Sequence, residues 1–113
     1  MLEKPVIAGN WKMHRGPEET RAFFERFQPT SSSRATLLVF PPTVSLAAAA
    51  DCVVGGPVRL GIQNVHWESA GAFTGETSVA MAREAGAEFA LIGHSERRHV
   101  FGETDDEVGR KVK

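Results

Sequence analysis

The chain has 113 residues, of which 42% are hydrophobic and 24% are charged, and its formal net charge is −1. This length suits one domain, and this composition is typical of a folded globular protein and not of a disordered one. The scattered basic residues and the near-zero charge argue against a protein that binds nucleic acid or a membrane surface, because both need a concentrated positive patch.

Cysteine content and the N-terminal segment favour a cytoplasmic protein. Cys52 is the single cysteine, so an internal disulfide is impossible, as is usual in a reducing compartment. We interpret Cys52 as a small buried apolar residue in preference to a reactive thiol. Residues 1–5 lack the basic region and long apolar run of a secretory signal, and no apolar stretch approaches the roughly 18 residues that a membrane-spanning helix needs.

Four short apolar runs are predicted to form strands. They cover residues 6–8, 35–40, 58–62 and 88–92. The run over 35–40 is apolar on both faces instead of alternating, which is typical of a strand in a parallel sheet that helices cover on both sides.

The first helix is predicted to begin at Pro17, since proline suits the first helical position. Phe23, Phe24 and Phe27 follow at helical spacing and should form the stripe that faces the core.

Three later segments also carry helix signals. Thr43 is predicted to cap a helix through residues 46–50, and Ser78 to cap another that stops near Gly86. Residues 105–113 begin acidic and end basic, which matches the helix dipole at both ends. Regular alternation of strands and helices predicts right-handed βαβ units and a parallel α/β sheet.

The connection over residues 64–77 is long for a compact domain and carries two large aromatic side chains, Trp67 and Phe73. Two interpretations stay open at this point. The aromatic rings either pack against the protein's own surface or contact a partner.

Two polar motifs stand where predicted strands end, the edge at which parallel α/β folds place their active sites. Residues 8–13 read AGNWKM and residues 93–98 read GHSERR. Lys12 is either a ligand for an anionic substrate or an ordinary solvated lysine.

His94 and Glu96 are the other chemically capable groups of these motifs. His94 lies where a helical turn can begin, so the positive end of the helix dipole should keep its ring neutral. A neutral ring can donate a hydrogen bond to a carbonyl or enolate oxygen. The alternative is that His94 has a purely structural role. Glu96 stands beside two arginines and is expected to support an ion pair and not to act as a free base.

We predict no metal site, because the histidines show no ligand spacing. We also predict no nucleotide cofactor, because no phosphate-binding motif is present.

These two motifs, together with residues 63–65 (QNV) and 71–76 (GAFTGE), resemble the triosephosphate isomerase family in order and spacing along essentially the whole chain. The resemblance implies that residues 1–113 form a single partial domain of the α/β class, the N-terminal (β/α)4 portion of a TIM (β/α)8 barrel. It also implies an intramolecular oxidoreductase that interconverts dihydroxyacetone phosphate and D-glyceraldehyde 3-phosphate through an enediol(ate) in glycolysis and gluconeogenesis, without a cofactor.

The resemblance assigns roles to particular residues. His94 would be the electrophile, Lys12 and Asn10 would bind the triose phosphate, and Glu96 would support Lys12. Thr74 would lie in a loop that contacts the second subunit of a homodimer.

The family's glutamate base has no counterpart in this sequence, so we expect little or no activity from the 113 residues alone. The alternative is a non-catalytic half-barrel that serves as an assembly or folding unit, because an open sheet leaves unpaired strand edges.

Overall fold

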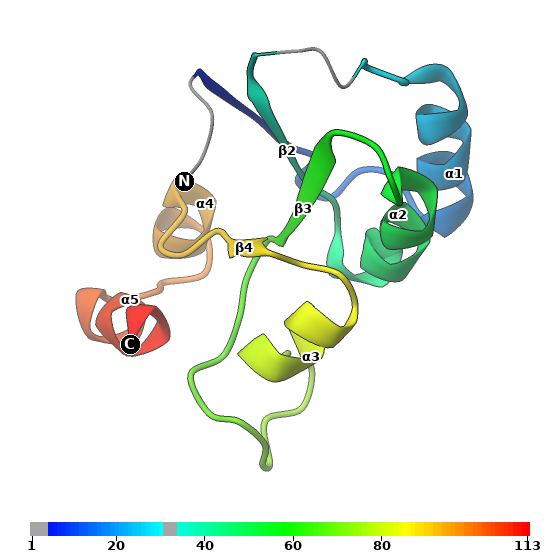
Figure 1. Cartoon of the computed structure of the whole chain (residues 1–113). Coiled ribbons are helices and arrows are strands. Elements are labelled where there is room, and N and C mark those ends of the chain that lie inside the picture. Colours follow the sequence, from blue (N-terminus) through cyan, green and yellow to red (C-terminus); the bar gives the residue numbers. More distant parts are fainter. Residues whose placement is uncertain (1–4, 31–33) are drawn as a thin grey trace.

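Strands and helices alternate along the computed structural model of the chain, which describes residues 5–30 and 34–113 (Figure 1). Most of the N-terminal segment considered above as a secretory signal lies outside this range. In chain order the elements are β1 (Val6–Asn10), α1 (Pro17–Arg26), β2 (Thr36–Phe40), the 3₁₀ turn η1 (Thr43–Ser45), α2 (Leu46–Val53), β3 (Val58–Ile62), α3 (Val79–Glu84), β4 (Phe89–Ala90), α4 (Ser95–His99) and α5 (Asp105–Val112). The four predicted strands and their intervening helices are therefore confirmed.

The strands form one parallel sheet in the order β1-β2-β3-β4. Consecutive parallel neighbours require a crossover after every strand, and α1 and α2, which pack against each other, lie on the same side of the sheet (Figure 1). The architecture matches the N-terminal half of a (β/α)8 barrel, as expected.

β4 is shorter than the predicted run over 88–92, with only Phe89 and Ala90 in the strand. The backbone on each side still bonds to β3: the Glu88 N–H donates to the Leu60 carbonyl and the Leu91 N–H to the Ile62 carbonyl. At Gly93 the backbone adopts a φ of +68°, which ends the extended path and leads into α4.

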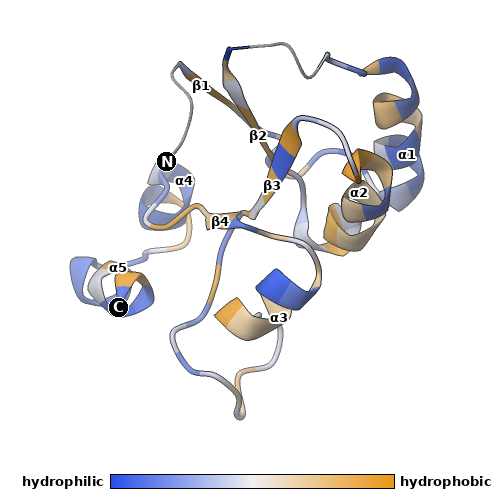
Figure 2. Ribbon diagram, in the orientation of Figure 1, coloured by the Kyte–Doolittle hydropathy of each residue, from blue (hydrophilic) through white to orange (hydrophobic). Residues whose placement is uncertain are grey.

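The core lies between the sheet and the helices α1 and α2, and it extends to Ala82 of α3. It is built by buried apolar residues, which are Phe24, Val39, Leu46, Ala49, Val58, Leu60, Ile62, Val65, Ala82 and Ala87. The hydropathy colouring shows many polar residues on α1, α4 and α5, whereas α2 is largely apolar (Figure 2). β2 is buried on both faces as predicted, whereas Val6 and Ile7 of β1 are 43% and 56% exposed. The edge of β1 opposite β2 has no strand beside it in the described part of the chain.

Gly61 of β3 is required by close packing against Phe40. A β-carbon at Gly61 would lie 2.1 Å from Cε1 of the Phe40 ring, which is itself buried in β2. We expect Gly61→Ala to lower the free energy of unfolding by about 1–3 kcal/mol, because the ring must leave its rotamer or the strands must separate. Urea unfolding would measure the loss, and an unchanged midpoint would contradict this packing.

The observed starts of the helices agree in part with those predicted from the sequence. Pro17 begins α1, and the Ser78 hydroxyl accepts a hydrogen bond from the Met81 N–H, as predicted. The predicted cap at Thr43 is wrong, because Thr43 begins the 3₁₀ turn η1 and α2 starts only at Leu46.

α5 carries a complete capping box that the sequence analysis did not identify. The Thr104 hydroxyl accepts from the Glu107 N–H at 3.2 Å, and the Glu107 carboxylate accepts from the Thr104 N–H at 3.0 Å. Thr104→Ala should destabilise the protein by about 1 kcal/mol, since one N-terminal N–H of the helix loses its acceptor. Thermal unfolding compared with Thr104→Ser, which keeps the hydroxyl, would test this; equal stability of the alanine and serine variants would contradict it.

Cys52 is exposed, so the prediction of a buried thiol is wrong. α2 turns Ala49 and Val53 toward the core, and Cys52 lies one position away on the side that faces solvent. Phe27 is likewise 38% exposed, because it lies just beyond the last turn of α1, whereas Phe24 is buried as expected.

The connection over residues 64–77 packs its aromatic rings largely against itself. The buried His66 ring lies between Trp67 and Phe73, with 4.2 Å between ring centroids on each side. The Arg110 guanidinium of α5 lies 5.5 Å from the centre of the Trp67 ring. Trp67 is therefore half-buried against its own chain, while Phe73 stays 43% exposed.

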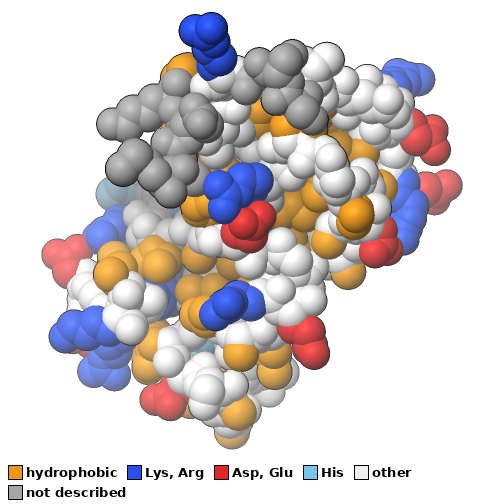
Figure 3. Space-filling model, in the orientation of Figure 1, with side chains coloured by type: hydrophobic (Ala, Val, Ile, Leu, Met, Phe, Trp, Pro, Cys, Tyr) orange, Lys and Arg blue, Asp and Glu red, His pale blue; other side chains and the backbone are white. Residues whose placement is uncertain are grey.

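Charged side chains of both signs are scattered around the outline of the molecule on the face shown in Figure 3. Apolar side chains are exposed between them. Across residues 5–30 and 34–113, none of the helices combines the length and the apolar character that crossing a bilayer requires.

Candidate active site

A cleft of about 330 Å³ lies where the parallel strands end. Asn10 ends β1, and His94 and Glu96 follow β4, so strand direction alone brings these distant parts of the sequence to one edge. The cleft is lined by Asn10, Lys12, Met13, Thr43, Gln63, Asn64, Gly75, Glu76, Leu91, His94, Glu96, Arg97 and Phe101. The four predicted site residues Asn10, Lys12, His94 and Glu96 therefore lie together, whereas Thr74 is outside this lining, exposed on the 64–77 connection.

The backbone of Lys12 is held in a strained conformation. Its φ of +55° lies in the left-handed region, which non-glycine residues rarely occupy. Two hydrogen bonds hold it there: the Lys12 N–H donates to Asn10 Oδ1 at 2.9 Å, and the Lys12 carbonyl accepts from Gln63 Nε2 at 2.8 Å. Such strain persists only where surrounding contacts determine it, and it is concentrated at functional sites.

The Lys12 side chain extends to Glu96. Its Nζ lies 2.7 Å from Oε1 of Glu96, with both side chains about half exposed. The hydrogen bond from Lys12 holds the pKa of the Glu96 carboxyl below its ordinary value, and the positive charge of Lys12 acts in the same direction against partial desolvation. Glu96 is thus a stable anion and a poor proton acceptor. Its partner is Lys12, whereas the two arginines beside it pair with Glu103 and Asp105.

His94 caps the short helix α4. Its Nδ1 accepts a hydrogen bond from the Glu96 N–H at 3.2 Å, so Nδ1 carries no proton and the neutral ring must carry its hydrogen on Nε2. That Nε2 lies 3.4 Å from Nδ2 of Asn10. The amide oxygen of Asn10 already accepts from Lys12, so the two facing nitrogens are both donors and can each donate to an acceptor atom of a ligand.

Gln63 is a positioning residue to which the sequence analysis gave no role. Its Nε2 donates to the carbonyl oxygens of Lys12 and Phe40, each at 2.8 Å, and so ties the loop after β1 to the end of β2. Its signal in the sequence is its place directly after β3, at the same edge as Asn10.

A buried ion pair lies beneath this edge. Nζ of Lys111 in α5 lies 2.5 Å from Oε2 of Glu103, and their side chains are only 4% and 3% exposed. Lys111 also donates to Oδ1 of Asn64 at 2.7 Å, and Nε of Arg97 lies 3.4 Å from the same carboxylate oxygen. Burial alone would raise the pKa of Glu103, but the bonds and charges of Lys111 and Arg97 outweigh it, and the pKa lies below its ordinary value.

The lowered pKa of Glu103 predicts acid sensitivity. A carboxyl whose pKa is lower in the folded state than in the unfolded state stabilises the fold above its unfolded value, and this stabilisation is lost as pH falls toward the folded pKa. We expect the free energy of unfolding to decrease as pH drops below about 4.5, the ordinary value. The decrease should be smaller in Glu103→Gln; a wild-type slope in that variant would contradict the assignment.

Three groups of the cleft are suited to an anionic ligand: the Lys12 ammonium, the Asn10 amide and the His94 ring. Lys12 can neutralise an anionic ligand, while the His94 ring and the Asn10 amide can donate to an oxygen that becomes negative during a reaction. Within the described ranges there is no group of three or more His, Cys, Asp or Glu side chains able to hold a metal ion.

Comparisons with known proteins identify the family of the chain. The sequence profile of the family described as triosephosphate isomerase matches residues 5–113. The chain is similar to the triosephosphate isomerases of Solibacter usitatus (50% identical over 113 residues), Synechocystis sp. (48% over 115) and Caldanaerobacter subterraneus (45% over 112). Each alignment covers 98% of this chain and 45–47% of the relative, so the chain spans about half the length of the curated relatives it matches. With a profile match over nearly its whole length, the chain belongs to the triosephosphate isomerase family.

Proposed function

We propose that this chain carries the anion-binding and electrophilic half of an active site that interconverts dihydroxyacetone phosphate and D-glyceraldehyde 3-phosphate through an enediol(ate). The observation that supports this most directly is the meeting of three donors in one cleft: the Lys12 ammonium, the Asn10 amide and the ring of His94. Family membership supplies the reaction, since the relatives are named triosephosphate isomerase.

Each group has a distinct task in this proposal. Lys12 attracts the phosphate-bearing substrate and stabilises the negative charge that develops on it. The Nε2–H of His94 donates to the substrate oxygens, polarises the carbonyl and exchanges a proton between the two oxygens as the enediol(ate) rearranges. Asn10 donates to the substrate with its amide nitrogen while its oxygen fixes the Lys12 backbone.

The general base lies outside this chain in our proposal. Glu96 and Glu76 are the carboxylates that line the cleft in the described part of the chain. Glu96 is bound to Lys12 and its pKa is low, while Glu76 lies on the exposed 64–77 connection. Neither is a buried carboxylate, free of a cationic partner, of the kind that proton abstraction from carbon calls for.

The test is turnover of glyceraldehyde 3-phosphate, first by the 113-residue chain and then by a fusion of this chain to the C-terminal remainder of the Solibacter usitatus relative. We expect no measurable turnover by the chain and clear turnover by the fusion. Full turnover by the chain alone would refute the missing base. A folded fusion without activity would refute the assigned reaction.

We propose that residues 1–113 are one part of a larger single domain, that Thr74 contacts a second subunit of a homodimer, and that the protein works in the cytoplasm without a cofactor. The exposure of Thr74 and of neighbouring Phe73 is compatible with that contact.

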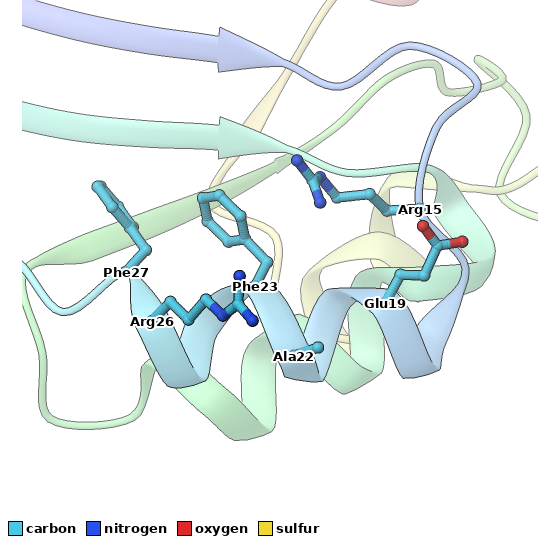
Figure 4. A pocket seen from close by; sticks show the side chains of 6 residues that line it. All are labelled: Arg15, Glu19, Ala22, Phe23, Arg26 and Phe27. Carbon is cyan, nitrogen blue, oxygen red and sulfur yellow. The ribbon is translucent and has the colours of Figure 1, made fainter.

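A second candidate function, assembly through the outer edge of the sheet, is favoured by β1. Its Val6 and Ile7 are exposed, and a shallow pocket of about 560 Å³ lies beside α1, lined by Arg15, Glu19, Ala22, Phe23, Arg26 and Phe27 (Figure 4). An unpaired apolar strand edge can receive another strand, and the pocket on α1 offers apolar surface to a second element. Sedimentation at several concentrations would test this, and a monomer at every concentration would count against it.

A further inference from the structure

The buried pair formed by Glu103 and Lys111 performs no chemistry in the proposed reaction and does not touch the open part of the cleft. Neither residue is among those that line the cleft, and both side chains are almost wholly buried. A buried ion pair is a poor device for stability, because burying two charges costs about as much as their attraction returns. In the described residues, Oε1 of Glu103 is moreover a buried oxygen without a hydrogen-bond partner, which is a further cost. The pair calls for another explanation.

Lys111 is connected to the backbone of Lys12 through Asn64 and Gln63. Lys111 donates to Oδ1 of Asn64, which lies directly after Gln63 in the chain. Gln63 in turn donates to the Lys12 carbonyl and so helps to hold the strained φ of +55°.

Glu103 is connected to the side chain of Lys12 through Arg97 and Glu96. The Glu103 carboxylate lies 3.4 Å from Nε of Arg97, and the Glu103 N–H donates to the Arg97 carbonyl at 3.0 Å. Arg97 directly follows Glu96, whose carboxylate is paired with Nζ of Lys12.

We infer that Glu103 and Lys111 are positioning residues that set the place of Lys12, one through Arg97 and Glu96 and the other through Asn64 and Gln63. α5 is well placed for this task, because Val108 packs against Gly93, the residue before His94: a β-carbon at Gly93 would lie 3.1 Å from both Val108 methyl groups. The inference depends on the proposed function for the importance of Lys12, but its test does not.

The test replaces the charged pair by a neutral one in the 113-residue chain and follows the titration of Glu96. Glu103→Gln combined with Lys111→Met removes one negative and one positive charge, so the net charge near Glu96 stays the same. Carbon-detected NMR of the Glu96 carboxyl gives its titration midpoint. The matched control is Arg59→Met with Glu88→Gln, which removes an exposed ion pair with a 2.7 Å contact on another part of the sheet.

We expect the Glu96 midpoint to rise toward its ordinary value of 4.5 in the double variant, because a displaced Lys12 no longer holds the carboxylate, and to stay unchanged in the control. A folded double variant with the wild-type midpoint would overturn the inference. If the double variant does not fold, Asn64→Ala removes only the connection from Lys111 to Gln63 and should raise the Glu96 midpoint by a smaller amount. An unchanged midpoint in Asn64→Ala would equally overturn the inference. A titration needs no turnover, so this result is independent of whether the fusion isomerises triose phosphates.

Discussion

Lys12→Met, made in the fusion described above, is expected to lower kcat/KM for glyceraldehyde 3-phosphate by about 10²–10³-fold, the usual effect of removing one preorganised group that stabilises developing charge. Methionine keeps the length of the side chain. The two hydrogen bonds that fix the backbone of residue 12 join its own main-chain atoms to the side chains of Asn10 and Gln63, and so they remain. The loss should therefore come from the missing charge and not from a collapsed loop. Steady-state kinetics over a range of substrate concentrations would measure it.

The loss should be divided between the two kinetic constants. A raised KM with unchanged kcat would mean that Lys12 only attracts the anion, whereas a fall in kcat would show that the charge also matters in the transition state. We expect both to change. Arg21→Met removes an exposed cation of α1 that does not line the cleft, and it should leave both constants unaltered.

His94→Gln gives an independent check of the same cleft, with His99→Gln as its control because His99 lies exposed on the same short helix. Loss of activity in the first variant and full activity in the second would separate the cleft from the helix that carries it. Equal effects of the two would instead mean that α4 matters only as a structural element.

The place of the cleft could be predicted from the sequence because it depends on local signals. Apolar runs reveal strands, parallel strands end at one edge, and polar residues just after two of those runs must therefore meet there. Asn10 and His94 are 84 positions apart, yet strand direction alone brings them together. The same reasoning could have included Gln63, which also follows a strand directly.

Buried charge could not be predicted in this way. Lys111 lies at the basic end of α5, so its sequence position indicates a solvated residue that matches the helix dipole. Its actual partners, Glu103 and Asn64, lie 8 and 47 positions away and depend on how α5 docks on the strand ends. The exposure of Val6 and Ile7 in β1 could not be predicted from the sequence either, since an apolar run looks the same whether or not another strand covers its outer edge.

The docking of α5 can be tested through its buried cation. Lys111→Met is expected to lower the free energy of unfolding by about 3 kcal/mol at neutral pH, because Glu103 then stays buried with only the more distant Arg97 opposite it. The loss should shrink at acidic pH: without Lys111, burial raises the pKa of Glu103, and the protonated carboxyl no longer carries a buried charge.

Urea unfolding at pH 7 and pH 5 would show both effects, and the exposed pair offers a matched control. Arg59→Met breaks the contact with Glu88, in which both side chains are about half exposed, and should cost less than about 1 kcal/mol at either pH. Equal losses for the two variants would mean that Lys111 is solvated and that α5 does not cover it. A loss for Lys111→Met that stayed constant between the two pH values would mean that the destabilisation comes from lost packing, and the unpaired charge of Glu103 would then have no part in it.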